Sequence, residues 1–240
     1  IQTELCLADL EIVEKRIMKL AKIAKSGNKE AKVEDEILRR IKAALDEGTP
    51  ARQVDLSEDD LELIKEMNLL TLKPTLYVTN VAEDEVATAY DENPYVQQVK
   101  EYAAKEGAEV VAISAKVESE IAELDEEEAK AFLEDLGETE SGLDRLIKAA
   151  FDLLGLQTFL TAGPDECRAW TIVKGTTAPK AAGKIHTDFE RGFIRAEIVN
   201  YNDLIAAGSV AAAREKGQVR VEGKDYVMQD GDVVNFRFNV

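Results

Sequence analysis

The fold is decided by the stretch Leu76-Tyr-Val-Thr-Asn-Val-Ala-Glu83, an apolar strand that ends at an asparagine with a carboxylate three residues further on. A second apolar run, Val110-Val-Ala-Ile113, comes later and ends in Ser114-Ala-Lys116. Short, continuous apolar runs of this kind are typical of strands buried on both faces of a sheet. Polar residues at the ends of two such strands are typical of the part of a nucleotide site that reads the base.

The segment between the two strands predicts how they pair. Residues 94–105 have a helical pattern that Gly107 closes before the second strand begins. Strand, helix and strand in this order predict a parallel crossover. In such sheets ligands bind outside the carboxyl ends of the strands, where Asn80 and Ser114 stand.

A phosphate-holding loop is missing from the sequence. Such a loop needs Gly-x4-Gly-Lys-Ser/Thr, because successive backbone N–H groups wrap the phosphates and a hydroxyl reaches magnesium. The nearest approach, Gly217 to Gly223-Lys224-Asp225, has five intervening residues and an aspartate where the hydroxyl should be. We therefore expect the chain to be the C-terminal part of a larger enzyme and Ile1 to be a cut end.

The amino-acid composition is that of a globular protein without a membrane-spanning segment. The 240 residues are 45% hydrophobic and 32% charged, which fits a globular protein, and no apolar run is long enough to span a bilayer. Two isolated cysteines, Cys6 and Cys167, and a single histidine predict neither a disulfide framework nor a metal site. We therefore expect a cytoplasmic protein without a membrane partner.

Charge is distributed unevenly along the chain. The net charge is −18, yet residues 157–240 hold 11 acidic and 11 basic side chains, so residues 1–156 carry the whole excess. An acidic body argues against nonspecific nucleic-acid binding over the full surface, and we expect no recognition of DNA sequence. A local basic face remains compatible with this balance.

Residues 5–47 predict an antiparallel helical hairpin, broken at residues 26–28. Two coiled-coil stripes form its seam: Leu10, Val13, Ile17, Leu20 and Ala24, then Val33, Ile37, Ile41 and Ala44 or Leu45. Ser57 and Asp60 form a capping pattern for a further helix over residues 61–67. The hairpin is interpreted either as a helix pair packed on the body or as a projecting arm that contacts a partner.

Residues 157–240 differ in character from the rest of the chain. Short strands are predicted at residues 157–161, 167–172, 192–201, 219–221 and 233–240, with a turn at residues 163–165. A helix is predicted to begin at Ala178, and a short one at residues 203–207. We expect a small mixed sheet with one main helix across it.

Four runs of this region resemble a known family. They are Thr161-Ala-Gly-Pro-Asp-Glu-Cys-Arg-Ala-Trp-Thr-Ile172, Lys174-Gly-Thr-Thr-Ala-Pro179, Ile185-His-Thr-Asp-Phe-Glu-Arg-Gly-Phe-Ile-Arg195 and Asp230-Gly-Asp-Val-Val-Asn-Phe-Arg-Phe-Asn-Val240. The resemblance is to the YchF-type (Obg-like) ATPases of the P-loop translation-factor-related class, and it covers essentially the whole chain.

The resemblance implies an α/β fold with three parts. Residues 1–70 would form the coiled-coil hairpin and the following helix, inserted in a P-loop NTPase parallel sheet. Residues 71–156 would form the C-terminal half of that nucleotide-binding domain. Residues 157–240 would form a TGS domain, a ubiquitin-like β-grasp fold. Roughly the first third of a typical member, with the phosphate loop and both switches, would be absent.

The base-binding residues predicted from the two strand ends are Asn80, Val81, Glu83, Ser114, Ala115 and Lys116. In GTP-binding relatives the fourth motif is Asn-Lys-x-Asp, and here Val81 stands where the lysine would be and Glu83 where the aspartate would be. The longer side chain moves the carboxylate away from the guanine-reading position, and an amide can pair with N6 and N7 of adenine together. ATP is therefore expected to be preferred over GTP. Lys116 is expected either to cover the base or to face solvent.

No residue is predicted to be catalytic or to bind a metal. His186 is a candidate for catalysis as the single histidine, but its position beside Thr187 and Asp188 favours a structural or surface role. The resemblance implies ATP and Mg²⁺ as cofactors of the intact parent, in which the absent segment handles the phosphates and the attacking water. This chain alone is expected to be inactive and to hold no cofactor.

A basic set in the last region is predicted to face RNA, with Phe189 and Phe193 interleaved for stacking. Its members are Lys174, Lys180, Lys184, Arg191 and Arg195. The other interpretation is ordinary surface charge around core phenylalanines. Two hypotheses follow: part of a ribosome-associated ATPase that binds an adenine nucleotide and the ribosome or structured RNA, or a noncatalytic RNA- or protein-binding adaptor.

Overall fold

The computed structural model describes residues 1–24, 28–86, 92–163 and 166–239. These residues form two compact units, Ile1–Thr139 and Glu140–Val240. The predicted turns at residues 26–27 and 164–165 lie outside the described residues.

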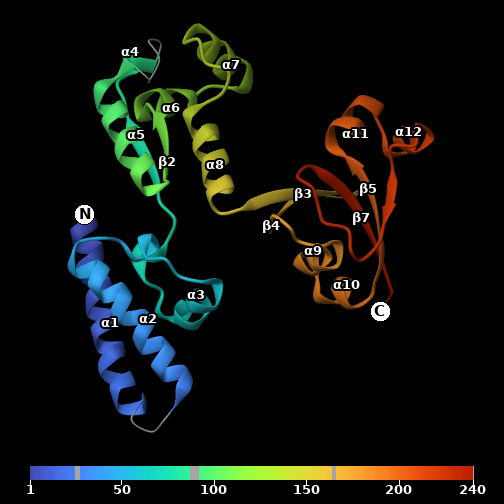
Figure 1. Cartoon of the computed structure of the whole chain (residues 1–240). Helices are drawn as coiled ribbons and strands as arrows, with labels where there is room; N and C mark the ends of the chain where they lie inside the picture. The colour runs from blue at the N-terminus through green and yellow to red at the C-terminus, as the bar shows by residue number, and fades with distance from the viewer. Residues whose placement is uncertain (25–27, 87–91, 164–165, 240) are drawn as a thin grey trace. The chain divides into compact units, whose positions relative to one another are not determined.

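The first unit begins with two helices that lie side by side, α1 (Gln2–Ala24) and α2 (Lys29–Asp46) (Figure 1). Asn28 caps the start of α2, because its side chain accepts a hydrogen bond from the backbone N–H of Ala31. Arg16 of α1 donates from Nη2 to Glu34 of α2 at 2.8 Å. The helical hairpin predicted from the sequence is therefore present.

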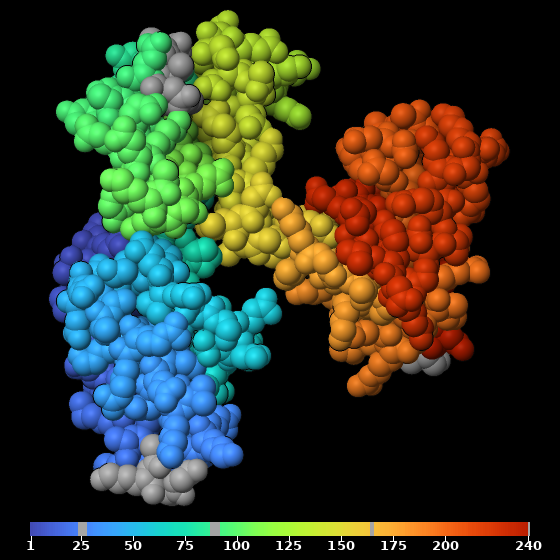
Figure 2. Space-filling model, viewed as in Figure 1, coloured from blue at the N-terminus to red at the C-terminus, as the bar shows by residue number. Residues whose placement is uncertain are grey.

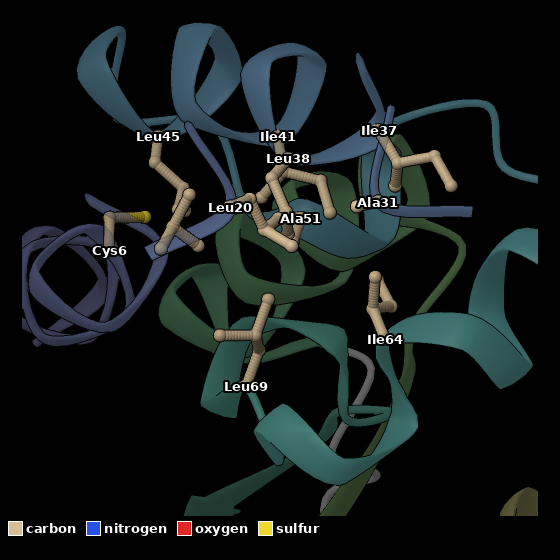
Figure 3. Packing of buried hydrophobic residues seen from close by; sticks show 11 residues of the cluster. Cys6, Leu20, Ala31, Ile37, Leu38, Ile41, Leu45, Ala51, Ile64 and Leu69 are labelled. Carbon is tan, nitrogen blue, oxygen red and sulfur yellow. The ribbon is translucent and has the colours of Figure 1, made fainter. Parts of the chain in front are cut away.

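The hairpin shares its core with the segment that follows it. Apolar side chains of α1 and α2 meet Ala51, Ile64 and Leu69 in one buried cluster (Figure 3). In α2 the buried stripe includes Ile37, Leu38, Ile41 and Leu45, whereas Val33 is exposed. The predicted position of Val33 in the seam is wrong, because α2 packs against this third layer as well as against α1.

Residues 51–72 cross the base of the hairpin in short helices. They are η1 (Ala51–Gln53), α3 (Glu58–Ile64), η2 (Lys65–Met67) and η3 (Leu70–Leu72). The capping box of Ser57 and Asp60 is present at the start of α3. The fully buried carboxylate of Asp9 accepts hydrogen bonds from the backbone N–H groups of Leu70 and Thr71 at 2.8 and 2.7 Å. This carboxylate anchors η3 to α1.

Two parallel strands follow, β1 (Leu76–Asn80) and β2 (Glu109–Ile113), joined through α5 (Pro94–Glu106). Gly107 ends α5 with φ 66°, a left-handed conformation that glycine adopts readily. Asn80 is paired with Ile113, so the carboxyl ends of both strands lie at one edge. The predicted parallel crossover is confirmed.

Glu106, at the end of α5, connects the strands to the helical hairpin. Its carboxylate accepts hydrogen bonds from Gln2 of α1 at 3.2 Å, from Arg52 at 2.7 Å and from the hydroxyl of Tyr77 at 3.0 Å. In Figure 2 the blue start of the chain adjoins the green surface of α5.

Three further helices complete this unit: α4 (Glu83–Val86), α6 (Ala115–Ile121) and α7 (Glu126–Asp135). Val81, Val86, Val96 and Val117 form their common core, with Phe132 and Leu136 packed against it. The sequence predicts a helix over residues 125–136, and α7 confirms it. The helices α4 and α6 were not predicted, since each spans less than two turns.

The second unit has a five-stranded mixed sheet in the order β4-β3-β7-β5-β6. The strands are β3 (Leu156–Ala162), β4 (Cys167–Val173), β5 (Phe193–Asn200), β6 (Arg220–Glu222) and β7 (Asp232–Phe238). The helices are α8 (Gly142–Leu153), α9 (Ala178–Ile185), α10 (Thr187–Arg191), α11 (Tyr201–Ala207) and α12 (Val210–Glu215).

Each face of this sheet has its own apolar cluster. Ala178, Ala181 and Ala182 of α9 pack on one face against a buried group that includes Phe159 and Phe236. The other face carries Val199 and Val233, which pack with Ala213 of α12. The expected mixed sheet with a main helix is confirmed. Among the described helices, none combines the length and the apolar character that crossing a bilayer would require.

Candidate functional site

The six predicted base-contacting residues lie at one edge of the parallel strand pair. Asn80 Oδ1 accepts a hydrogen bond from the backbone N–H of Ala115 at 2.9 Å, which ties the end of β1 to the start of α6. The backbone N–H of Val81 donates to the carbonyl of Ile113 at 2.8 Å. The contact between Asn80 and Ala115 leaves the Nδ2 amide of Asn80 available to a ligand acceptor.

A hollow of about 750 Å³ opens at this edge. It is lined by Asn80, Val81, Ala82, Glu83, Asp84, Lys116 and Leu136. Four of these residues were predicted from the sequence, whereas Ser114 and Ala115 lie outside the lining. Leu136, at the end of α7, had no signal beyond its place in the apolar pattern of that helix.

Glu83 and Lys116 form an ion pair across the mouth of the hollow. The hydrogen bond and the charge of Glu83 raise the pKa of the Lys116 ammonium, so the lysine remains protonated. Glu120 adds a second carboxylate 3.9 Å from Lys116 Nζ. The sequence left two positions open for Lys116, over the base or in solvent, and the structure places it against Glu83.

Ser114 occupies the turn between β2 and α6 and is 2% exposed. Its hydroxyl has no hydrogen-bond partner among the described residues, and neither does the buried hydroxyl of Thr79 on β1. Buried polar atoms without partners are uncommon in folded proteins and mark places where a ligand or water completes the bonding. Both orphan hydroxyls belong to the strand ends that were predicted to hold a base.

The charges around the hollow do not suit a polyphosphate. Among its described lining residues the single cation, Lys116, is paired with Glu83, and Asp84 adds another carboxylate. Such a lining accommodates an uncharged ring better than a chain of phosphates. Among the residues that the structure describes, no three histidine, cysteine, aspartate or glutamate side chains are grouped to hold a metal ion.

The predicted RNA-facing set is divided in the structure. Lys174 pairs with Asp152 at 2.7 Å, Lys180 pairs with Glu190 at 2.9 Å, and Arg195 lies 3.9 Å from Glu197. Lys184 and Arg191 have no ion pair within the described part of the chain. Arg195 flanks Ala196, which is buried in the cluster beneath α9, so Arg195 lies on the opposite face of the sheet.

The aromatic part of that prediction is wrong for one residue. Phe193 is buried in the core, where its ring packs against Phe236, so it cannot stack on a base. Phe189 stacks on Phe238 with ring centroids 3.9 Å apart. His186 caps α10 by accepting a hydrogen bond from the N–H of Asp188, which is the structural role that the sequence favoured.

Comparison with known proteins now identifies the family. "Ribosome-binding ATPase YchF" of Bacillus subtilis (strain 168) is 58% identical over all 240 residues, and its namesake in Haemophilus influenzae is 54% identical over the same length. The chain belongs to the YchF family. It spans 65% of the length of these relatives, in their C-terminal part.

Two further matches agree with the YchF assignment. The family model YchF-GTPase_C, described as a protein of unknown function (DUF933), matches residues 156–239. A solved structure of the Schizosaccharomyces pombe YchF GTPase superposes with a TM-score of 0.85 at 35% identity, and covers 99% of this chain and 64% of that one. YchF proteins are thus named both as ATPases and as GTPases, and these names leave the base preference of this chain open.

Proposed function

We propose that this chain supplies the purine-binding edge of a nucleotide site in a ribosome-associated ATPase of the cytoplasm. The observation that carries the proposal is the hydrogen bond from Ala115 N–H to Asn80 Oδ1, which joins the two strand ends at the mouth of the hollow. The free Nδ2 of Asn80 can donate to N7 of a purine. The orphan hydroxyl of Ser114 lies beside the same contact.

The proposed base is adenine. Guanine presents N–H donors on its Watson–Crick edge and needs a carboxylate with free acceptor positions. Glu83 is engaged by Lys116, so its carboxylate offers guanine less than an unpaired aspartate would. Adenine lacks that requirement, which supports the preference for ATP over GTP.

Hydrolysis is proposed for the intact parent rather than for this chain. ATP and Mg²⁺ would be held there by a phosphate loop, which the present sequence does not contain. Residues around the hollow would bind and orient the base and would exclude water from it. This division of labour predicts that the chain alone binds a nucleoside weakly and does not hydrolyse ATP.

A noncatalytic adaptor is the alternative function. It is supported by Lys184 and Arg191 on neighbouring helices of the second unit, which form no ion pair with any residue that the structure describes. In that case the chain would dock on RNA or protein and the strand pair would serve as a spacer.

The base site is tested by NMR titration of the full chain with adenosine and with guanosine. Adenosine should shift the Asn80 side-chain amide and the Ala115 backbone amide at millimolar concentration, and guanosine should shift them less. The exposed side-chain amide of Asn202, on the second unit, is the matched control. Shifts that appear at Asn202 but not at Asn80, or stronger shifts with guanosine, would contradict the proposal.

A further inference from the structure

Three arginines of the second unit converge on one carboxylate. Glu197 of β5 lies 3.9 Å from Arg195, 3.0 Å from Arg214 of α12 and 3.1 Å from Arg237 of β7. We name Arg195, Arg214 and Arg237 the arginine cluster. The three arginine side chains are half or more exposed, whereas the Glu197 side chain is 13% exposed.

Glu197 accepts hydrogen bonds from only a few of the guanidinium N–H groups around it. Arg237 donates from Nε and Nη2 to its two oxygens, and Arg214 donates from Nη2 to one of them. Arg195 is too distant for a hydrogen bond. Each guanidinium carries several N–H donors, so most of them remain available. Hydrogen bonding and the charge of Arg237 lower the pKa of Glu197, which therefore stays ionised and leaves the cluster with an excess of positive charge.

The placement of two of these arginines costs stability in the absence of an anion. Arg195 and Arg237 are direct partners across the antiparallel pair of β5 and β7. Like charges directly opposite on neighbouring strands repel each other. Glu197 stands on the same face, opposite Asn235, and offsets only part of this repulsion. An anionic ligand would offset the remainder.

The surface around the cluster is accessible. Arg195 and Glu197 lie on the face of the sheet opposite α9, and a small hollow of about 150 Å³ beside them is lined by Glu197, Arg214, Val199 and Asn235 among others. Residues 157–240 carry no net charge, in contrast to residues 1–156. Residues 157–240 taken by themselves therefore repel a polyanion less than residues 1–156 do.

We propose that the arginine cluster binds the phosphodiester backbone of RNA. The planar guanidinium fork matches a phosphate better than an ammonium does, and several forks side by side match consecutive phosphates. The proposal rests on the proposed association with the ribosome and assigns it to a surface. Arg195 was the one member predicted from the sequence; Arg214 and Arg237 replace the lysines of α9 as its partners.

The test measures binding of the full chain to a fluorescently labelled single-stranded RNA of twelve nucleotides by anisotropy, at several salt concentrations. One variant combines Arg195→Gln, Arg214→Gln and Arg237→Gln. The control variant combines Lys180→Gln, Lys184→Gln and Arg191→Gln, which removes the same charge from α9 and α10. The cluster variant should bind at least about tenfold more weakly, and its slope of log K against log salt should fall by about 2, since single strands contribute about 0.7 per phosphate.

The control variant should lose less than about threefold in affinity, and its salt slope should change little. A third variant with lysine at the three cluster positions keeps the charge; it should recover most of the salt slope but not the full affinity. Circular dichroism melts verify that every variant is folded. If the glutamine substitutions disturb the fold around the cluster, the lysine variant still tests whether RNA binding depends on the arginine side chains, because it keeps the charge.

The outcomes separate this proposal from the wider one. Equal losses of RNA affinity in the cluster variant and the control variant would show that RNA binds through nonspecific charge. That result would overturn the assignment to the arginine cluster but not the association with RNA. Displacement of the RNA by polyglutamate at equal charge would identify an acidic-peptide surface and would also overturn it. If the wild-type chain binds no RNA but sediments with ribosomes, the RNA-binding role of the arginine cluster alone is refuted. If it neither binds RNA nor sediments with ribosomes, the ribosome association is refuted as well.

Discussion

Arg52 and Glu106 form an ion pair, 2.7 Å from Nη2 to Oε2, that joins the segment after the helical hairpin to the end of α5. The two side chains are 17% and 5% exposed, so solvent screens their attraction little. Gln2 and Tyr77 donate to the same carboxylate, which makes Glu106 the shared partner of α1, η1 and β1. Its removal should therefore affect the first unit as a whole.

The first prediction concerns the stability of this junction. Glu106→Ala should lower the free energy of unfolding by about 3 kcal/mol, because the largely buried guanidinium of Arg52 loses its carboxylate partner. Glu101→Ala, at an exposed position of the same helix, should change it by less than about 0.5 kcal/mol. Urea denaturation at neutral pH measures both. Equal losses would show that the junction contributes nothing specific.

The second prediction concerns pH. Burial raises the pKa of Glu106, but hydrogen bonds from Arg52, Tyr102, Gln2 and Tyr77 outweigh it and hold the pKa below the ordinary 4.5. A carboxyl whose pKa is lower in the folded state stabilises the fold above its unfolded pKa and loses this effect as pH falls.

The stability difference between wild type and Glu106→Gln should therefore be full at pH 7 and should shrink as the pH drops below 4.5. Urea denaturation across this pH range is the measurement. A difference that grows toward low pH would reverse the sign and contradict the lowered pKa.

The third prediction concerns base preference. Lys116→Ala releases Glu83, which can then accept from the guanine edge, so the preference for adenosine over guanosine should fall by about threefold, the equivalent of one weak hydrogen bond. NMR titration of each variant gives the two affinities. Lys130→Ala, which removes an exposed lysine near Glu134 on α7, should leave the preference unchanged.

The fourth prediction concerns the phosphates. The hollow is lined by Glu83 and Asp84, so this chain should bind ATP no more tightly than adenosine. Calorimetric titration with both ligands tests it. Micromolar binding of ATP would mean that residues of this chain hold the phosphates, contrary to the proposed division of the site.

Much of the fold could be predicted from the sequence because its periodicities are long. The helices of the hairpin run for 23 and 18 residues, and two continuous apolar strands flank α5. The helices α4, α6, α10 and α12 have four to seven residues, show less than two turns of pattern and were missed. The equally short α3 and α11 were predicted. Val33 was misplaced because a stripe that meets two partners is wider than one that meets a single helix.

The candidate sites likewise have parts that the sequence predicts and parts that it does not. Asn80 and Ser114 could be brought together from the sequence because the carboxyl ends of parallel strands meet at one edge. The pairing of Glu83 with Lys116 depends on side-chain reach, which no local pattern encodes. The arginine cluster joins positions 195, 214 and 237, which only the pairing of β5 with β7 and the packing of α12 bring into contact.

Asp9 of α1 accepts hydrogen bonds from the backbone of Leu70 and Thr71, and β1 begins shortly afterwards at Leu76. A displacement of α1 would therefore act on the start of that strand through a short connection, since η3 ends at Leu72. The same strand ends at Asn80, so a change in the position of α1 would reach the lining of the hollow through β1.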